Sequence, residues 1–581
     1  MAEVYDFIII GSGFGGSVAA LRLAEKGYRV LVLERGKRFR DADFPQTNWD
    51  VRRFVWLPAL HCFGIQEFSL LRDVMVLHGS GLGGGSLVYG NVLMEPDAAS
   101  FQNPGWHTLQ NWPEVLRPYY ATAKRMLGVA SNPRLWPADE ALRQVAGELG
   151  QAESFRPNAV GVFFNENAPG QPVPDPYFGG EGPARAGCIH CGGCMVGCRH
   201  NAKNTLVKNY LYLAEKRGVE IRTEAEATRI RPLEPNAEDG ARYEVVYRRS
   251  TLPLNPPHFG VRARSVVVAA HPLGTLRLLF RCRDVFGTLP RLSERLGQNV
   301  LTNSESISGV TARTRQADYS QGIAITSTFR ADAETHVQPV RYPPGSSFIR
   351  LLAAPMSHYP SALGRVLIAL TWLALRPLDT ALIYWRGAWA ERTTILLTMQ
   401  HREERLRLRL GRDWRTLWRR NLVSEAPPEQ RQRGAEGHVA RLVTRRLAER
   451  VNGVAQTTSY EALLGIPATA HLLGGVPMGN SAADGVVDRY GEVFNYPGLY
   501  VTDGSIMPAN PGINPSLTIA ALAEYVMSHI PPKAAPPQPA EPQPSSIIER
   551  RRGVGLAWLG LGILCGVAVQ WAIRWAGRLR G

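Results

Sequence analysis

The chain opens with two apolar runs separated by an amphipathic segment. Residues 5–10 (Tyr-Asp-Phe-Ile-Ile-Ile) and 29–33 are short and apolar, as buried strands are. Residues 15–27, between them, place apolar side chains at the spacing of one helix face. The pattern predicts a strand–helix–strand unit at the start of the chain.

Further apolar runs occur along the chain without forming a repeat. The pattern predicts three more strands and two more helices, namely strands over 219–222, 265–269 and 499–501 and helices over about 203–217 and 515–530. Residues 306–454 differ in character and hold long apolar stretches rich in Trp and Arg. The length and this order of elements are typical of an α/β (α+β) protein of two or three packed domains.

An apolar run of ten residues over 366–375 is ended by Arg376 and Pro377. Ten residues are too few to cross a bilayer as a helix. Two interpretations remain open. The run is a core helix of a substrate-binding domain, or it dips into a membrane interface, where flanking Trp and Arg are favoured, and admits a lipid substrate.

The C-terminal region has the pattern of a linker followed by a membrane span. Residues 531–552 begin with a Pro-, Ala- and Gln-rich stretch, which predicts an extended linker. Residues 553–573 form an uncharged run of 21 residues, long enough for a transmembrane helix. Three Trp residues suit the two interfaces, namely Trp558, Trp571 and Trp575. Three Arg residues lie on each side of the run, so charge does not decide its orientation.

Composition indicates a large folded protein with a basic surface. The 581 residues are 45% apolar, and the formal net charge is +16 at pH 7. Such a balance indicates anionic membrane lipid or nucleic acid as a partner, or only a solvated basic face with no specific partner. Because the sequence holds no zinc finger, basic zipper or aromatic-rich sheet motif, we expect no nucleic-acid partner. The first residues lack the features of an export signal, so we expect a membrane protein whose catalytic body is cytoplasmic.

A dinucleotide-binding fingerprint follows the first predicted strand. Gly11, Gly13 and Gly16 have the spacing G-x-G-x-x-G at the start of the predicted helix. The first glycine permits a tight turn, the second lets the backbone approach a pyrophosphate, and the third allows close packing of helix and strand. Glu34 ends the second predicted strand, where a carboxylate binds ribose hydroxyls. Since this fingerprint starts a long, interrupted chain, it favours FAD over NAD.

With a second glycine-rich stretch added, the chain resembles the glucose–methanol–choline (GMC) oxidoreductases, in particular their cholesterol oxidase branch. The stretch is Gly-Leu-Gly-Gly-Gly-Ser-Leu-Val-Tyr over 81–89. Other stretches that carry the resemblance are 269–279, 289–303, 471–475, 500–505 and 512–515. The resemblance is thin over 306–454.

The resemblance implies a GMC fold, in which a Rossmann-type FAD-binding domain made of separate chain segments holds an inserted substrate-binding domain. We expect FAD-binding segments at 1–100, 185–305 and 455–530, a cap segment on the substrate side at 101–184, and the substrate-binding domain at 306–454. The last FAD-binding segment also carries the catalytic residues.

The resemblance also assigns residues to the cofactor. It places Gly85, Tyr89, Gly90 and Val92 along the isoalloxazine ring. It adds Ala227, Asp503 and Gly504 to the FAD-binding residues. The chain departs from the pattern at Tyr89, where related cholesterol oxidases carry Asn, so we expect different contacts at the edge of the flavin.

His471 and Asn514 match the catalytic residues of the family. Oxidation of an alcohol removes the hydroxyl proton while hydride leaves the carbon for the flavin. An imidazole suits the orientation or deprotonation of that hydroxyl near neutral pH. The asparagine amide can hold the substrate oxygen or tune the flavin through its dipole.

Four of the seven cysteines fall within eleven residues. Cys188, Cys191, Cys194 and Cys198 have the spacing C-x₂-C-x₂-C-x₃-C, which resembles that of bacterial ferredoxins and predicts a [4Fe-4S] cluster. A four-cysteine zinc site and reduced buried thiols are the alternatives. A cluster would pass electrons from reduced flavin to a membrane acceptor in place of O₂.

These patterns together predict an FAD-dependent enzyme that oxidises the hydroxyl group of a lipophilic alcohol. We expect a sterol as substrate and O₂ as acceptor, with a long-chain alcohol as the second substrate class. One alternative is a dehydrogenase that passes its electrons through an iron–sulfur cluster to a membrane acceptor instead of to O₂. A membrane-anchored electron-transfer flavoprotein without an alcohol substrate is the alternative from another class.

Overall fold

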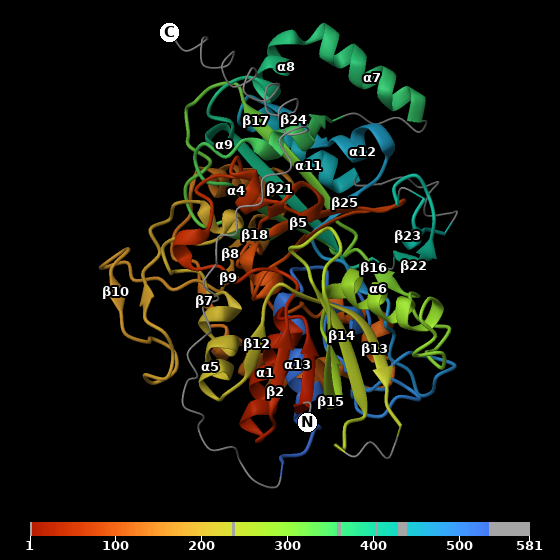
Figure 1. The fold of residues 1–581 in the computed structure, drawn as a ribbon. Helices are drawn as coiled ribbons and strands as arrows, with labels where there is room; N and C mark the ends of the chain where they lie inside the picture. Colours follow the sequence, from red (N-terminus) through yellow and green to blue (C-terminus); the bar gives the residue numbers. More distant parts are fainter. Residues whose placement is uncertain are drawn as a thin grey trace, which may run out of the picture. The chain divides into compact units, whose positions relative to one another are not determined.

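The computed structural model describes residues 3–234, 239–356, 362–402, 404–416, 418–427 and 438–533, and Figure 1 shows their arrangement. The predicted transmembrane helix over 553–573 and nearly all of the predicted linker over 531–552 lie outside the described residues. The segment boundaries derived from the family resemblance stay predictions.

The first sheet joins strands from distant parts of the chain. Its order is β12 (Glu220–Arg222), β2 (Val30–Leu33), β1 (Val4–Ile10), β15 (His258–Val268), β14 (Tyr243–Arg249) and β13 (Ala225–Pro232), with β27 (Leu499–Val501) also paired to β15. The pairs β12–β2, β2–β1, β1–β15 and β15–β27 are parallel, whereas β15–β14 and β14–β13 are antiparallel. The structure confirms the predicted strands, although β15 begins seven residues earlier than 265.

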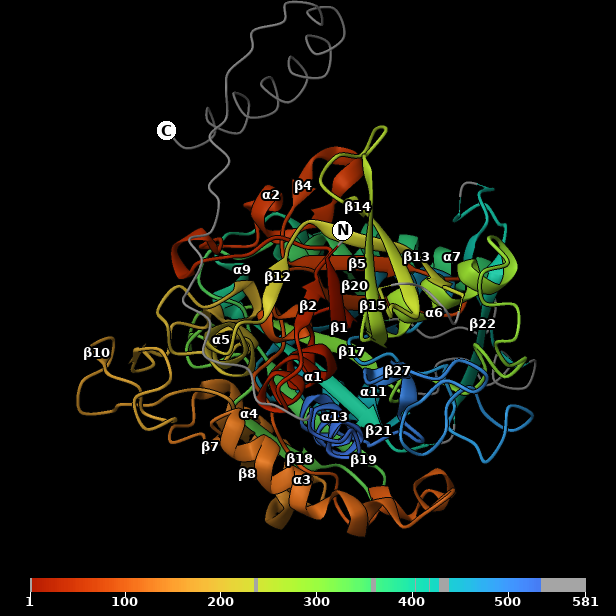
Figure 2. The same cartoon turned by 60° about the horizontal axis from the view of Figure 1, so that its bottom comes forward.

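Helices cover this sheet and bury its apolar runs. α1 (Phe14–Glu25) packs against α13 (Ser516–Ser528) and α5 (Tyr210–Lys216), and α3 (Trp112–Met126) packs on α13, as Figure 2 shows. Ile8, Ile9 and Val267 are completely buried between these layers. The opening strand–helix–strand unit is therefore the core of the first domain, as its pattern predicts.

The helix predicted over 203–217 is shorter in the structure. α5 begins only at Tyr210, after a 3₁₀ turn over Leu206–Lys208. The residues before the turn are held by distant parts of the chain: the Asn204 amide donates to the carbonyls of Leu127 and Gly128, each at 3.0 Å. Tertiary hydrogen bonds thus override the local helical pattern.

The second sheet is antiparallel and belongs mainly to the predicted substrate-binding domain. Its order is β20 (Ala353–Pro355), β24 (Gly453–Thr458), β17 (Ser306–Ala312), β21 (Thr393–Gln400), β19 (Thr335–Val340), β18 (Ser327–Arg330) and β8 (Arg156–Pro157). α4 (Pro137–Glu148) and α11 (His438–Arg450) pack on one face, where Phe329, Val310 and Leu447 share an apolar cluster. Strands β17, β19 and β21 of this sheet contribute side chains to the site described below.

Short strands between the two sheets position the turn around residue 471. β6 (Met75–Gly79) pairs with β5 (Gln66–Leu70) and in parallel with β25 (Ala468–Thr469). β26 (Leu473–Gly474) pairs with β16 (Val300–Leu301), which in turn pairs with β22 (Arg405–Gly411). The segment between β25 and β26 is therefore fixed at both ends, beside the second glycine-rich stretch.

The apolar run over 366–375 lies in α7 (Ala362–Leu375), which α8 (Pro377–Tyr384) follows after a sharp bend. Most of its large apolar side chains are exposed, so the core-helix interpretation is wrong for this segment. Within the described part of the chain, no single helix has the length and hydropathy to cross a membrane. The segments Leu363–Leu375 and Pro377–Tyr384 meet that test only as a pair, with a bend of 100° between them.

Candidate active site

One cavity of about 560 Å³ is lined by both sheets and by the segments between them. Residues of the opening glycine turn, of β13, and of the second glycine-rich stretch line it, as do His471 and Asn514. Side chains of β17, β19 and β21 add an apolar wall. Elements far apart in sequence thus meet around a volume suited to a cofactor and a small substrate.

The opening glycines are required by close backbone contacts. A Cβ at Gly11, where φ is +99°, would lie 2.2 Å from the carbonyl oxygen of Ala269, and one at Gly16 would lie 2.0 Å from that of Gly11. A Cβ at Gly13 would meet no described protein atom within 4 Å, and Gly13 lines the cavity. Two glycines therefore serve packing, and the third leaves room for a ligand at the N-terminus of α1, as predicted.

Glu34 directly follows β2, next to the glycine turn, and is buried. Its carboxylate accepts hydrogen bonds from the Ser12 hydroxyl at 2.6 Å and from the backbone N–H of Gly36 at 2.6 Å. The side chain thus ties the turn to the end of β2 while it lines the cavity. Remaining lone pairs on the carboxylate are free for ribose hydroxyls, and this role stays a prediction.

Most of the other predicted cofactor residues line the same cavity, namely Gly85, Tyr89, Gly90, Ala227, Asp503 and Gly504. Val92 does not line it. Its side chain is buried behind the wall in an apolar cluster with Ile325 and Ile513. The Val92 side chain therefore lies outside the cavity that the other predicted FAD-binding residues line. The structure gives this residue a packing role, which its position in the motif did not reveal.

Tyr89, the residue that departs from the family pattern, is held through its hydroxyl and through the face of its ring. Its hydroxyl donates to the carbonyl oxygen of Asn204 at 2.9 Å. The ammonium of Lys203 lies 4.7 Å from the ring centroid and donates to the carbonyls of Leu87 and Cys194. Burial lowers the pKa of Lys203 to about 8 and raises the pKa of Tyr89. The hydroxyl of Tyr89 therefore points away from any ligand that its ring contacts.

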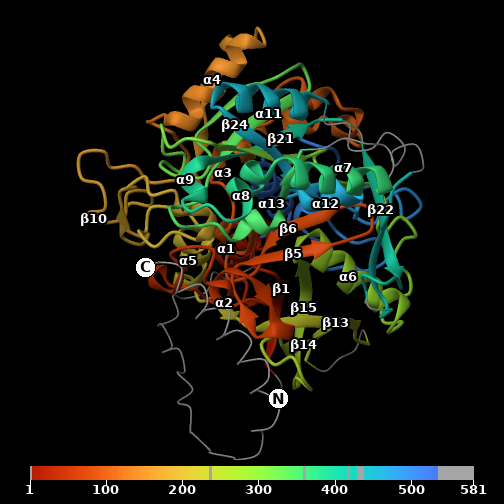
Figure 3. The same ribbon diagram turned by 90° about the horizontal axis from the view of Figure 1, so that it is seen from above.

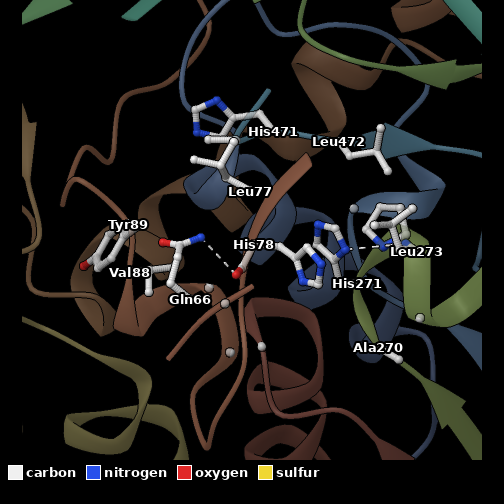
Figure 4. Close-up of a pocket in the computed structure, with 18 of the residues that line it drawn as sticks. Gln66, Leu77, His78, Val88, Tyr89, Ala270, His271, Leu273, His471 and Leu472 are labelled. Atoms are coloured by element: carbon white, nitrogen blue, oxygen red, sulfur yellow. Dashed lines mark hydrogen bonds between the residues drawn. The ribbon is translucent and has the colours of Figure 1, made fainter. Parts of the chain in front are cut away.

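Two histidines, the buried His78 and the partly buried His271, stack at the cavity wall. The rings of His78 and His271 are 4.8 Å apart and nearly parallel, and Figure 4 shows them next to one another. Gln66 donates to the carbonyl of His78 at 3.2 Å. Burial lowers the pKa of His78 to about 4 and that of His271 well below its usual value. Both imidazoles are therefore neutral near pH 7.

His471 is paired with a carboxylate that the sequence did not predict. Its Nδ1 contacts Oε1 of Glu305, which lies just before β17. The Glu305 side chain is completely buried and also accepts from the Thr469 hydroxyl at 2.9 Å and from the N–H of Ala470 at 2.7 Å. Since a carboxylate only accepts, Nδ1 carries the proton, and Nε2, which has no hydrogen-bond partner in the described part of the chain, is left as an acceptor.

Asn514 lies just before α13 on the same cavity wall and is buried. Its Oδ1 has no hydrogen-bond partner among the described residues. A buried amide oxygen without a partner is costly, and the cavity is where a ligand can supply a donor. The structure thus brings the two predicted catalytic residues to one cavity.

The four clustered cysteines surround a second, much smaller cavity of about 20 Å³. All four are free thiols, and burial raises the pKa of Cys191 to about 11. Within the described ranges, no group of three or more His, Cys, Asp or Glu side chains is arranged to hold a metal ion. The predicted [4Fe-4S] cluster and its zinc alternative therefore find no support in this arrangement.

Comparisons with known proteins identify the family. The family model described as GMC oxidoreductase matches residues 411–523, and a model described as NAD(P)-binding Rossmann-like domain matches residues 9–48. A cholesterol oxidase of Mycobacterium tuberculosis is 44% identical over 556 residues, which cover 92% of each chain. The chain belongs to the GMC oxidoreductase family. Its place in the cholesterol oxidase-like branch, which the sequence motifs indicated, is confirmed.

Other comparisons agree with this GMC assignment. A cholesterol oxidase of Acinetobacter baumannii is 40% identical over 531 residues, with coverage of 91% of this chain and 95% of the relative. The crystal structure of pyridoxine 4-oxidase from Mesorbium loti shares the fold, with a TM-score of 0.57 and 17% identity over 90% of this chain and 98% of that one. The protein is an FAD-dependent GMC oxidoreductase that acts on CH–OH groups.

The site residues fit FAD. The open space at Gly13, the buried acceptor Glu34 and the unpartnered Asn514 Oδ1 all face the cavity. Sequence patterns missed Glu305, His78, His271 and Lys203. His271 holds a left-handed φ of +66°, where glycine would be favoured, but this strain is visible only in the structure.

Proposed function

We propose that the protein oxidises the hydroxyl group of a sterol, cholesterol first, and that O₂ is the final electron acceptor. The observation that carries the proposal is a single cavity that is lined by the dinucleotide turn, by His471 and Asn514, and by an apolar wall of the second sheet. The names of the two relatives, both cholesterol oxidases, support the choice of a sterol.

FAD, when bound, accepts the hydride that leaves the carbinol carbon. His471 takes the hydroxyl proton, because its Nδ1–H is held by Glu305 and its Nε2 is left as an acceptor. Glu305 fixes the tautomer and orientation of the imidazole and balances its charge once protonated. Asn514, on the same cavity wall, has an amide oxygen without a partner that can accept a hydrogen bond from the bound ligand.

The apolar wall suits a rigid hydrocarbon skeleton. Ile307 of β17, Val340 of β19 and two residues of β21, Ile395 and Leu397, line the cavity. Such side chains exclude water and offer no hydrogen bonds to a polar substrate. Burial of its hydrocarbon skeleton against this wall therefore favours binding of a lipophilic alcohol, and its hydroxyl group can then contact His471.

The proposal is tested by anaerobic titration of the FAD-loaded protein with cholesterol and, separately, with a long-chain fatty alcohol. We expect cholesterol to bleach the oxidised flavin absorbance, and admission of air to restore it with formation of hydrogen peroxide. If only the fatty alcohol bleached the flavin, the substrate would be a long-chain alcohol and not a sterol. Bleaching by cholesterol without peroxide would assign a different electron acceptor.

We propose further that residues 553–573 anchor the enzyme in a membrane, with the catalytic body in the cytoplasm. The 21 uncharged residues of this run support the proposal, since a helix satisfies its own backbone hydrogen bonds inside lipid. Deletion of residues 546–581 should release the enzyme from membranes that are washed with high salt and leave flavin reduction intact. If the truncated enzyme stayed on the washed membranes, residues 553–573 would not be its membrane anchor.

A further inference from the structure

Trp389 is a buried hydrogen-bond donor that lines the main cavity and has no partner. It begins the short helix α9 (Trp389–Arg392). The side chain is 3% exposed, and its indole N–H donates to no acceptor within the described part of the chain. A buried donor without an acceptor costs folding free energy. Because Trp389 lines the cavity, a bound ligand can supply the missing acceptor.

The second sheet separates α9 from the catalytic pair. Glu305, which holds His471, directly precedes β17, and the first residue of β17 is paired with Thr398 of β21. Thr393, at the other end of β21, directly follows α9, and α9 packs against both strands; Figure 3 shows α9 and β21 from above. Thr398 and Thr393 are five residues apart, which is about 17 Å of antiparallel strand. A sterol is of comparable length from its ring hydroxyl to the end of its side chain.

The cavity face of β21 changes from apolar to polar along this length. Leu397, Ile395 and Thr393 line the cavity from alternate positions of the strand, as side chains on one face do. The first two are apolar, whereas Thr393, next to α9, carries a hydroxyl. This hydroxyl lies 2.8 Å from that of Thr311, which accepts from the Gln456 amide at 2.6 Å. A buried chain of polar groups thus ends at the cavity where α9 meets the sheet.

This polar end of the cavity is uncharged. Among the described residues, every Asp, Glu, Lys, Arg or His side chain that lines the cavity belongs to the predicted FAD-binding segments, as Glu34 and Arg277 do. The lining residues of the second sheet and of α9 carry only hydroxyl, amide, indole or apolar groups. A carboxylate would lose its hydration there without gaining a counter-charge. The donor therefore suits a neutral oxygen, either a hydroxyl or a carbonyl.

We propose that the Trp389 N–H binds an oxygen at the far end of the substrate, so that a sterol with a hydroxyl or carbonyl group on its side chain is held more tightly than cholesterol. The proposal rests on the proposed function, because it takes a sterol whose ring hydroxyl lies at His471. The hydrocarbon skeleton then faces the apolar part of the wall, between two polar ends. Trp389 is thus a specificity-determining residue and takes no part in proton or hydride transfer.

The test measures binding without reaction. The probes are cholest-4-en-3-one and 25-hydroxycholest-4-en-3-one, given to the FAD-loaded full chain as soluble cyclodextrin complexes. Neither ketone has a ring hydroxyl to oxidise, so its binding is followed by the perturbation of the oxidised flavin absorbance. We expect the hydroxylated ketone to bind roughly threefold to tenfold more tightly, the range of one net hydrogen bond between neutral groups.

Two matched variants assign the preference to one side chain. Trp389→Phe removes the donor but keeps an aromatic ring at the cavity, and we expect it to bind both ketones with nearly equal affinity. Trp106→Phe is the control, because Trp106 is also fully buried with an unpartnered N–H but does not line the cavity. The control should keep the preference of the parent. Thermal unfolding and flavin absorbance per chain show that both variants are folded and loaded.

Equal affinity of the parent for the two ketones would overturn the proposal, whatever the variants do. An unchanged preference in Trp389→Phe, or an equal loss of preference in Trp106→Phe, would also overturn it, because the indole N–H of Trp389 would not be the cause. Bleaching of the flavin by cholesterol with equal binding of the ketones would leave the proposed function standing and overturn only this proposal. Tighter binding of the hydroxylated ketone without bleaching by cholesterol would do the reverse.

Discussion

His471 and Glu305, 166 residues apart in sequence, form an imidazole–carboxylate pair at the wall of the cavity. The carboxylate is completely buried, and two further donors near His471 hold it in place, the Thr469 hydroxyl and the Ala470 N–H. The pair orients Nε2 as a proton acceptor, in the way that a buried acid orients the histidine of a hydrolase triad. In the proposed mechanism, Glu305 is therefore a positioning residue, and His471 is the residue that touches the substrate.

Replacement of the acid tests this arrangement. Glu305→Gln keeps the size of the side chain but removes its charge, so the protonated imidazole loses its partner. We expect flavin reduction by cholesterol to slow roughly tenfold to a hundredfold, with the FAD content unchanged. Stopped-flow absorbance under anaerobic conditions measures the rate. A rate equal to that of the parent would show that the pair is structural only.

Replacement of the base should have a larger effect. His471→Ala removes the proton acceptor, and we expect flavin reduction to slow roughly a hundredfold or more while FAD stays bound. The double variant His471→Ala/Glu305→Gln should be hardly slower than His471→Ala, because a positioning residue has nothing left to position. Fully additive losses would indicate that Glu305 acts independently.

Asn514→Ala removes the one predicted amide at the cavity wall. Its Oδ1 has no partner among the described residues, so the folded protein loses no internal hydrogen bond to that atom. We expect slower flavin reduction with little change in the thermal unfolding midpoint. A large drop in that midpoint together with normal reduction would make Asn514 a structural residue.

The glycine turn allows a matched test of cofactor binding. Gly13→Ala should fold normally but retain less FAD, because its new Cβ meets no described protein atom and enters the space at the cavity. Gly11→Ala should lower stability, since its Cβ would clash with the carbonyl of Ala269. Gly147→Ala, on an open face of α4, is the control and should be neutral or stabilising by about 0.4–1 kcal/mol. Flavin absorbance per chain and thermal unfolding measure the three variants.

His78 should make the protein sensitive to acid. Its folded pKa is about 4, chiefly through burial, with Arg35 and Arg277 lowering it further and Glu67 opposing them. The unfolded histidine takes up a proton near its ordinary pKa of about 6.5, so stability is full above that pH and falls as the pH drops toward 4. The loss attributable to His78 is on the order of 3 kcal/mol. Thermal unfolding of the parent and of His78→Gln at about pH 7 and about pH 4.5 should show a smaller drop for the variant.

The sequence predicted those parts of the site whose signal is local. Gly11, Gly13, Gly16 and Glu34 stand within one strand–helix–strand unit, so spacing alone places them. The family motifs located His471 and Asn514 for the same reason, since each lies in a short, distinctive turn. Glu305 was missed because its role exists only after β17 and β25 come together, and no pattern in one segment encodes that meeting.

Other differences also arise from tertiary packing. Hydropathy of residues 366–375 could not tell a buried helix from one with an exposed apolar face, because both carry the same residues. The spacing of the four cysteines resembles that of a ferredoxin, but spacing does not set where the thiols point. That depends on the turns between them, such as the left-handed Gly192 and Gly197.

Because β27 pairs with β15, the first sheet is completed only when the chain has been synthesised beyond residue 499. β1 and α1 emerge from the ribosome first, yet α1 packs on α13, which follows residue 515. The whole second sheet is made in the interval. The first domain therefore stays incomplete through most of translation, and a nascent chain that stops before residue 499 exposes the apolar face of α1 to chaperones and proteases.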